Sequence, residues 1–572
     1  MKNPRRGGRP RRRPLGSSSP AGRSAGPESP SDSNPSSQEI EANCPNVPSP
    51  APNSGGPDKP SEGKRRRPRR RRPRRSPRNR DPRSGSRRAA GDEGPVTLNE
   101  SAVKFPAIEG VPLLVDTHAH LEASNFDPDR KSVLERANSQ GVRLAIAVGS
   151  DVKSSRKSLK IADAYADVYA AVGVHPNEVK SVEKRTLATI ASLSESPKAV
   201  AVGEIGLDYY RDHTPQKLQR HWLRDQLRLA IKVQKPVIVH CRNADEDLYN
   251  ILNEERVWRV GGVLHCFTGD VEFANKLLGL DLYLGAAGPL AFEKSADLRK
   301  VFEGIPIERI LVETDSPYLS PPPDRGKRNE PGHVVRVAQV LADVFDLTME
   351  DVARITTHNA RRLFGFEVEN GAPVIAYRIE GKLYLNISVQ CSNSCIFCAR
   401  LTDYHYKGFN LSLKEEEPNV DAILEAAGDP SRYEEVVFSG FGEPTLRLDI
   451  LKEVARGLRE RGARRVRLVT NGLGNKTNGR NIFPELQGLV DDVSVSLQAG
   501  SAELYMKVCK TEGIEEPFSV VKDFVRRART YYPGVEVTAV DMPGIIDIDS
   551  CERVAREELG VSFRRRAYTL VD

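Results

Sequence analysis

Short apolar runs alternate with longer amphipathic stretches from about residue 110 onward. The runs read VPLLV, RLAIAVG, YAAVGV, AVAVG, KPVIVH, GGVLH, LYLGAAG and RILVET. Runs of this kind predict strands that are buried on both faces, and the segments between them are long enough for helices. Eight such units in about 250 residues match the size and order of an eight-stranded β/α barrel. The pattern therefore predicts one (β/α)8 TIM barrel over residues 112–366.

A second alternating pattern begins near Glu367. The stretch VENGAPVIAYRIEGKLYLNISVQ predicts a hairpin with its turn at Glu380 and Gly381. The later runs EEVVFSG, RVRLVTNG, DDVSVSLQ and VEVTAVD again alternate with helical segments. About 200 residues are too few for a full eightfold barrel. We predict a second α/β domain over residues 370–572, a partial and open (β/α)6 barrel.

The positive charge of the chain is concentrated before these domains. Residues 1–94 carry 24 Lys and Arg against 9 Asp and Glu, whereas the whole chain has a net charge of only +8. The block KRRRPRRRRPRR, from Lys64 to Arg75, repels itself and contains prolines, so residues 1–110 are predicted to be a disordered basic leader. Two interpretations of this leader stay open: salt-dependent, sequence-independent binding of nucleic-acid phosphates, or a solubilising tail without a partner.

The rest of the composition bears on the compartment. No apolar stretch approaches the roughly 20 residues that span a bilayer. The chain has 8 cysteines, three of them in one short loop, which is not the pattern of a disulfide scaffold. We expect a soluble, cytoplasmic protein that does not associate with membranes.

Six potential metal ligands directly follow apolar runs of the first barrel. They therefore fall at the carboxyl ends of its predicted strands, where barrel active sites lie. In an HxH pair on an extended segment both imidazoles point the same way and can reach one ion. Four imidazoles and two carboxylates can hold two ions if one carboxylate, for which Glu204 is the candidate, bridges them; such a pair suits the attack of an activated water on a phosphodiester. The six residues are His118, His120, Glu204, His240, His265 and Asp315.

Seven motifs in the barrel resemble the TatD family of metal-dependent hydrolases. They are, in order, DTHAH, GVHPN, GEIGLDYY, VIVHCR, HCFTG, ETDSPYL and RNEPGHV. The resemblance implies a deoxyribonuclease or related phosphodiesterase that works as a 3'-5' exonuclease with two divalent ions, Mg, Mn or Zn. It assigns one ion to His118, His120, Glu204 and Asp315 and the other to Glu204, His240 and His265.

The resemblance also implies that Asp315 and Glu204 are catalytic, Asp315 as the base that orients and deprotonates the attacking water. Other candidates follow from position and charge alone. His175 and Arg242 lie at the predicted rim and could contact a substrate phosphate, with helix capping or packing as the alternative. Lys327, Arg328 and Asn329 would clamp phosphate, with an ordinary solvated surface as the alternative.

Three cysteines in the second domain form a CxxxCxxC motif, namely Cys391, Cys395 and Cys398. Three thiolates on one tight loop can hold three corners of a 4Fe–4S cluster and leave the fourth iron open. A zinc site is the alternative, but zinc prefers four closed ligands and no fourth follows nearby. Cys509 and Cys551 are too isolated along the chain to decide between these alternatives.

This domain resembles the radical S-adenosylmethionine superfamily, because the cysteine motif is followed by SGFGEPT and then VTNG. The segments DDVSVSLQAGSAELYMKVCK and DMPGIIDIDSCERVAREELGVSFRRRAY resemble TatD-associated members of that superfamily. The resemblance implies a 4Fe–4S cluster, S-adenosylmethionine, an external electron donor such as flavodoxin or ferredoxin, and hydrogen abstraction from an unknown substrate. It places the methionine part of the cofactor at Gly440, Gly442, Glu443 and Pro444, and its nucleoside at Thr470 and Asn471.

The leading hypothesis is a phosphodiesterase fused to a radical enzyme, with a leader that tethers both to nucleic acid. Two alternatives remain. The barrel could instead cleave esters or amides, since the same chemistry attacks a carbonyl carbon, or the chain could be a nucleic-acid-binding scaffold with retired sites. A retired site would be expected to have lost ligands, and all nine proposed metal and cluster ligands are present.

Overall fold

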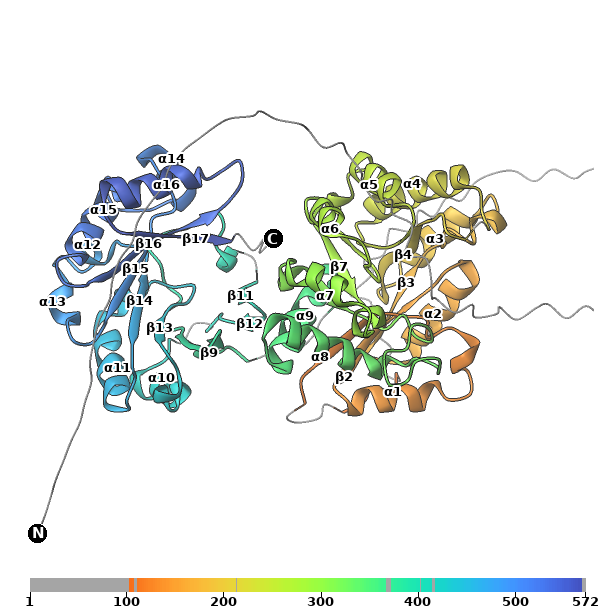
Figure 1. The fold of residues 1–572 in the computed structure, drawn as a ribbon, viewed down its shortest axis with the longest axis horizontal. Coiled ribbons are helices and arrows are strands. Elements are labelled where there is room, and N and C mark those ends of the chain that lie inside the picture. Colours follow the sequence, from red (N-terminus) through yellow and green to blue (C-terminus); the bar gives the residue numbers. More distant parts are fainter. Residues whose placement is uncertain are drawn as a thin grey trace, which may run out of the picture. The chain divides into compact units, whose positions relative to one another are not determined.

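The first domain is an eight-stranded parallel sheet with the strand order β1 to β8 (Figure 1). The computed structural model describes residues 102–106, 111–211, 213–366, 372–401, 403–413 and 417–567. The strands are β1 (Leu114–Ala119), β2 (Val142–Val148), β3 (Val168–Val172), β4 (Ala199–Asp208), β5 (Val237–Arg242), β6 (Gly262–Leu264), β7 (Leu282–Ala286) and β8 (Ile310–Val312). The helices are α1 (Arg130–Ser139), α2 (Val152–Ala164), α3 (Thr186–Ser194), α4 (Gln216–Val233), α5 (Asp245–Glu254), α6 (Val271–Leu278), α7 (Ala296–Glu303), α8 (Val334–Phe345) and α9 (Met349–Phe364).

The strands read as continuous apolar runs because both of their faces are covered. All ten residues of β4, for example, are buried. On β8, Leu311 packs in a cluster to which each of the eight strands contributes, whereas Ile310 and Val312 pack with helix residues. One side of each strand therefore fills the barrel interior and the other side binds the surrounding helices. The predicted TIM barrel is confirmed.

Helix boundaries follow local sequence. Asp151 caps α2 through a reciprocal pair of hydrogen bonds with Ser154, in which each side chain accepts from the other's backbone N–H, at 2.6 and 2.8 Å. Helix α9 begins after a Thr348 cap and ends at Gly365, which adopts a φ of 67°. Local sequence thus sets the beginning of α2 and both ends of α9.

The barrel is closed by hydrogen bonds between β1 and the chain that follows β8. The backbone N–H of Asp315 donates to the carbonyl of His118 at 2.8 Å, and that of His120 donates to Ser316 at 2.7 Å. The Thr117 hydroxyl also donates to the carbonyl of Val312 at 3.1 Å. Closure thus brings the two ends of the domain's sequence together at the rim.

The second domain contains a seven-stranded sheet with the order β17-β16-β15-β14-β13-β10-β9. Only β9 is antiparallel to its neighbour, so six parallel strands remain, as the predicted partial (β/α)6 barrel requires. The strands are β9 (Ala376–Ile379), β10 (Lys382–Leu385), β13 (Val436–Phe438), β14 (Val466–Thr470), β15 (Asp492–Ser496), β16 (Gly534–Asp541) and β17 (Ser562–Ala567), and a separate pair is β11 (His405–Tyr406) with β12 (Phe409–Asn410).

The predicted hairpin is confirmed by β9 and β10. Its two turn residues, Glu380 and Gly381, have φ values of 49° and 73°. A turn with two positive φ values matches the twist of the strands that it joins.

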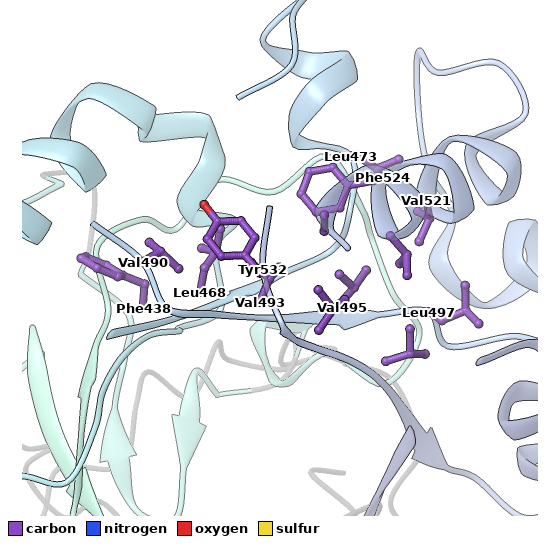
Figure 2. Packing of buried hydrophobic residues seen from close by; sticks show 14 of the residues in the cluster. Phe438, Leu468, Leu473, Val490, Val493, Val495, Leu497, Val521, Phe524 and Tyr532 are labelled. Atoms are coloured by element: carbon purple, nitrogen blue, oxygen red, sulfur yellow. The ribbon is translucent and has the colours of Figure 1, made fainter. Parts of the chain in front are cut away.

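Helices pack against this sheet around one core, part of which is drawn in Figure 2. Phe438, Leu468 and Val495 come from neighbouring strands, and Val521 and Phe524 come from a helix above them. The helices are α10 (Val420–Ala427), α11 (Leu448–Glu460), α12 (Gly474–Thr477), α13 (Phe483–Leu486), α14 (Ala502–Cys509), α15 (Pro517–Ala528) and α16 (Ile548–Arg553).

The predicted disordered leader, residues 1–110, lies almost wholly outside the described residues. Among the residues that the structure describes, no helix is both long and apolar enough to cross a membrane.

Candidate metal centre and cluster loop

Glu204, near the middle of the long strand β4, lies between two pairs of imidazoles. Its Oε2 is 3.7 Å from the Nε2 atoms of both His118 and His120. Its Oε1 is 3.0 Å from Nδ1 of His240 and 3.0 Å from Nε2 of His265. One carboxylate therefore presents a different oxygen to each pair, which is the geometry of a bridging ligand.

Asp315 joins the first of these pairs. Its Oδ1 lies 3.4 Å from Nε2 of His120 and 3.7 Å from Nε2 of His118, and the two imidazole nitrogens are 3.4 Å apart. The positive φ of Asp315, 55°, and the barrel-closing hydrogen bonds turn this side chain toward β1. The six predicted ligands are thus brought together at one rim.

The surrounding imidazoles favour an anionic carboxylate at the centre. Burial alone would raise the pKa of Glu204, but the facing imidazoles of His175, His265 and His240 hold it well below its usual range. Burial and the neighbouring His265 lower the pKa of His118 well below its usual value. Glu204 therefore offers two charged oxygens, and His118 offers a neutral imidazole.

The residues present fit two divalent cations. Nitrogen and oxygen donors converge in overlapping groups whose atoms lie within 4.8 Å of one another, and Glu204 is shared by two of these groups. Nδ1 of His118 is buried and has no hydrogen-bond partner among the residues that the structure describes, and Nε2 of this ring faces the centre. Imidazole and carboxylate donors suit Mg, Mn and Zn.

His175 lies beside the second pair and faces Glu204. The backbone N–H of Asn177 donates to Nδ1 of His175 at 3.1 Å, so the proton of the neutral ring sits on Nε2. That Nε2 is 3.6 Å from Oε1 of Glu204. Burial lowers the pKa of His175 to about 3, which keeps the ring neutral. In this tautomer His175 directs a proton toward Glu204, whereas a metal ligand would need a lone pair there.

Asp208, the last residue of β4, lies behind the imidazole of His240. The sequence analysis did not predict a role for it. Its Oδ2 lies 3.6 Å from Nε2 of His240 and accepts a hydrogen bond from Asn177 at 3.0 Å. Its Oδ1 accepts the backbone N–H groups of Tyr210 and Arg211 at 3.1 and 2.9 Å. A carboxylate behind an imidazole fixes the ring's orientation and tautomer.

In the second domain, the three cysteines lie on the loop that follows β10. They are all partly exposed, in contrast to the buried Cys509 and Cys551. The backbone N–H of Asn393 donates to Sγ of Cys391 at 3.5 Å, and that of Cys398 donates to the carbonyl of Cys395 at 3.0 Å. Three soft thiol donors on one short, hydrogen-bonded loop fit an iron–sulfur cluster.

The GFGEP segment after β13 packs tightly on the same loop. A Cβ at Gly440 would lie 2.1 Å from Oδ1 of Asn386, and one at Gly442 would lie 2.1 Å from the carbonyl oxygen of Ser388. The backbone N–H of Glu443 donates to the carbonyl of Gln390, next to Cys391, at 2.7 Å. Glycine is therefore required for the segment to reach the cysteines.

Glu443 ties this segment to the end of β14. Its Oε1 accepts the hydroxyls of Thr445 and Thr470 at 2.6 and 2.7 Å, and its Oε2 accepts the backbone N–H of Asn471 at 2.7 Å. Nδ2 of Asn471 in turn lies 3.6 Å from Sγ of Cys391. The predicted cofactor residues thus lie close to the cysteines. The Glu443 carboxylate joins two of these segments through hydrogen bonds within the protein.

Comparison with known proteins bears on both domains. The family model for TatD-related DNases matches residues 115–365, and the model for the radical SAM superfamily matches residues 385–553. The chain is 42% identical over 252 residues to an uncharacterized metal-dependent hydrolase, YabD, of Bacillus subtilis, and covers 99% of that protein with 44% of itself. The chain belongs to the TatD-related DNase family.

Two further TatD relatives show the same coverage of the barrel. The 3'-5' ssDNA/RNA exonuclease TatD of Citrobacter koseri is 35% identical over 260 residues, which are 44% of this chain and 99% of that one. The crystal structure of the TatD homologue YJJV from Escherichia coli aligns at 30% identity with a TM-score of 0.43, over 44% of this chain and 98% of that one. The chain is thus an enzyme that fuses a TatD metal-dependent hydrolase to a radical SAM domain.

Two exposed tyrosines flank the TatD-type centre. The ring of Tyr318, 56% exposed, lies edge-on to His120 with centroids 5.8 Å apart. Tyr210, 59% exposed, stacks under the Arg242 guanidinium at 3.8 Å. One exposed ring therefore lies beside a ligand of the centre and the other lies beside Arg242, two residues after His240, and sequence reasoning missed both.

The predicted phosphate clamp after β8 is wrong for two of its three residues. Arg328 donates to both carboxylate oxygens of Asp129, at 2.8 and 2.7 Å, and so is neutralised within the protein. Asn329 is fully buried, and its amide donates to the carbonyls of Thr314 and Tyr318. Lys327 alone is exposed, paired with Asp324. The Arg328 guanidinium and the Asn329 amide therefore stabilise the structure of the rim.

Proposed function

We propose that the TatD barrel is a two-metal exonuclease that removes nucleotides from the 3' end of single-stranded DNA or RNA. The observation that carries the proposal is Glu204, whose two oxygens face two separate imidazole pairs. The Citrobacter koseri relative is named a 3'-5' ssDNA/RNA exonuclease, which supports the polarity and the substrate class. A single-metal site would leave one of the two pairs without a function.

The distances support two ligand sets. His118, His120, Asp315 and Oε2 of Glu204 would hold one ion, and His240, His265 and Oε1 of Glu204 the other. When bound, such a pair supplies Lewis acidity, which lowers the pKa of water and offsets the charge that develops on a phosphodiester. Asp315, 14% exposed, is the ligand carboxylate most open to solvent, and it takes the proton of the attacking water on Oδ1 or Oδ2.

The exposed tyrosines support nucleic acid as the substrate. Bases of a single strand can stack on aromatic rings, whereas bases within a duplex are already stacked and paired. Tyr318 lies beside His120 of the first ligand set, and Tyr210 lies against Arg242, which follows His240 of the second set on β5 and can also face phosphate. The two rings would then stack on bases of the bound strand.

For the second domain we propose a 4Fe–4S cluster on Cys391, Cys395 and Cys398 with S-adenosylmethionine at its open iron. Reductive cleavage of that cofactor supplies a radical that abstracts hydrogen. Gly440, Gly442 and Pro444 would border its methionine part, and Thr470 and Asn471 its nucleoside. A flavodoxin or ferredoxin would supply the electron, in a cytoplasmic setting.

The leader suggests that the two enzymes share a nucleic-acid substrate. Its 24 basic residues would bind phosphates without regard to sequence and hold either site near the strand. This proposal rests on the composition of residues 1–94 alone. It requires that nucleic acid be cut by one domain or modified by the other.

The exonuclease proposal is tested with single strands labelled at either end. The full chain with Mn²⁺ should release labelled mononucleotide at once from a 3'-labelled strand and shorten a 5'-labelled strand step by step. A p-nitrophenyl ester run in parallel separates the acyl-hydrolase alternative. Cleavage of the ester with no cleavage of DNA or RNA would overturn the proposal.

The radical SAM proposal is tested anaerobically. Protein reconstituted with iron and sulfide, reduced and mixed with S-adenosylmethionine should release 5'-deoxyadenosine, and Cys398→Ala should not. No product from a reduced, cluster-loaded wild type would count against the proposed chemistry.

A further inference from the structure

Cys509 lies against the cluster loop although it is far from that loop in sequence. It is the last residue of α14, a position where backbone carbonyls have no partner within the helix. The backbone N–H of Ser394 donates to the carbonyl of Cys509, and that of Ile396 donates to the carbonyl of Val508, both at 3.0 Å. The two donors flank Cys395, so the loop is held to the helix end on either side of this cysteine.

The side chains of Cys395 and Cys509 also meet. Cys509 is fully buried, and Cys395 packs against the core cluster that contains it. The Cys395 thiol and the Cys509 thiol are joined by a hydrogen bond. The Tyr505 phenol lies close to both sulfurs. The two thiols are neighbours beside one phenol.

A polar network fixes the loop in this position. The Asn393 amide nitrogen lies 3.3 Å from the Tyr505 hydroxyl, and its carbonyl oxygen accepts the Thr511 hydroxyl at 2.7 Å. Asn393, Tyr505 and Thr511 are all buried. The contact between Cys395 and Cys509 is therefore part of a buried, hydrogen-bonded interface between the loop and the end of α14.

We propose that Cys395 and Cys509 form a reversible disulfide whenever the cluster loop holds no iron. The hydrogen bonds on either side of Cys395 and the contact between the two thiols hold the two sulfurs side by side, as a disulfide requires. The pairing rests on this geometry, whereas its consequence for the cluster rests on the proposed function of the loop.

The chemistry needs a peroxide as oxidant. The partly exposed Cys395 attacks hydrogen peroxide, which breaks the O–O bond and gives a sulfenic acid and water. The sulfur of Cys509 then attacks the Cys395 sulfur, the S–S bond forms, and the hydroxyl leaves as a second water with the Cys509 proton. Two thiols are oxidised by two electrons and one peroxide is reduced to two waters.

The disulfide and the cluster exclude each other, because Cys395 cannot bind iron through a sulfur that is bonded to Cys509. Oxidative loss of the cluster would thus leave one ligand protected in a form that thiols can reduce, instead of open to irreversible oxidation. The same bond would make reassembly of the cluster depend on a reductant.

Peptide mapping tests the pairing directly. The full-length, iron-free chain is treated with one equivalent of hydrogen peroxide, alkylated and digested with trypsin, which cuts after Lys382, Arg400, Lys507 and Lys510. Mass spectrometry should show residues 383–400 joined to residues 508–510, and dithiothreitol should separate them. Fragmentation should place the bond on Cys395.

Variants separate this bond from other oxidations. Cys509→Ser should remove the cross-link, and Cys551→Ser, which changes another fully buried cysteine, should retain it. A disulfide confined to Cys391, Cys395 and Cys398, or oxidation of Cys395 to a sulfinic acid with Cys509 still a thiol, would overturn the proposal.

Reconstitution gives a second readout. Oxidised wild type should regain cluster absorption only with dithiothreitol, whereas Cys509→Ser should regain it without. If wild type and Cys509→Ser regained it equally well without a reductant, the proposed link to the cluster would be wrong. If no variant ever bound iron, the proposed cluster would fail, while the mapped cross-link would still stand.

Discussion

The two sites of this chain are built in opposite ways. The metal centre of the barrel collects six side chains from β4, β5, β1 with the residue that follows it, and the segments after β6 and β8. The cluster loop carries its three cysteines within eight residues, from Cys391 to Cys398. The first site exists only when the whole barrel is closed, whereas the second is local and depends on distant residues for support. Loss of one ligand should therefore affect one site and spare the other.

The largest effect is expected from removing the shared carboxylate. Glu204→Ala should lower hydrolysis of single-stranded DNA at least about 1000-fold, because both ligand sets lose a charged oxygen and the transition state loses its fixed charges. The absorption of the reconstituted iron–sulfur cluster should not change. Glu246→Ala, at an exposed position on α5, is the control for activity. Loss of both signals would mean that the two domains form one catalytic unit.

A smaller effect is expected at Asp208, which acts through His240. Asp208→Asn should weaken binding of one of the two ions by about 10- to 100-fold, as is typical for a carboxylate that orients a ligand histidine. Titration calorimetry with Mn²⁺ measures this loss, and excess Mn²⁺ should restore most of the turnover.

Asp247→Asn gives the matched control. That carboxylate pairs with Arg220 on the outer surface, and its loss should leave Mn²⁺ binding unchanged. If Asp208→Asn bound both ions as tightly as wild type, Asp208 would have no positioning role.

The exposed tyrosines should contribute less and only to binding. Stacking of a base is worth about 1–3 kcal/mol, and at the lower end of that range Tyr318→Ala or Tyr210→Ala should raise the KM for a single strand by roughly fivefold. The corresponding Phe variants keep the ring and should keep the KM. An oligonucleotide whose last two sugars carry no base should not distinguish Ala from Tyr. A penalty that persisted on this substrate would exclude stacking.

The leader should have the smallest effect on chemistry. Deletion of residues 1–94 removes 24 basic residues and 9 acidic ones, so binding to long nucleic acid should weaken and the slope of log affinity against log salt should flatten. Turnover on saturating short oligonucleotides should stay the same. Fluorescence anisotropy at several salt concentrations measures the slope, and an unchanged slope would favour the solubilising interpretation.

Most of the barrel site can be predicted from the sequence, because simple rules link apolar runs to strands and the ends of parallel strands to one rim. Apolar runs predict the strands, and polar residues at the ends of those runs meet at one rim, so His118, Glu204, His240, His265 and Asp315 can all be found without coordinates. The structure extends β1, β4 and β5 past the apolar runs, so His118, Glu204 and His240 lie within strands. Asp208 was within reach as well. It lies four residues after Glu204 on one strand, and alternate residues of a strand share a face.

Other features depend on contacts that no local pattern encodes. The phosphate clamp was predicted from a basic run, but Arg328 meets Asp129 from the other end of the barrel sequence. Cys509 meets Cys395 only because α14 ends against the cluster loop. Pairing of residues so far apart in sequence is decided by tertiary packing, which the spacing of cysteines does not report.

Crystallography with manganese tests the central claim most directly. Crystals of the full chain grown with Mn²⁺, measured for anomalous scattering at the manganese edge, should show two peaks about 3.5–4 Å apart, one beside each oxygen of Glu204. The same protein should shorten single-stranded DNA from its 3' end. A single peak, or two peaks that do not share Glu204, in protein that still cuts DNA would contradict the bridged two-metal centre.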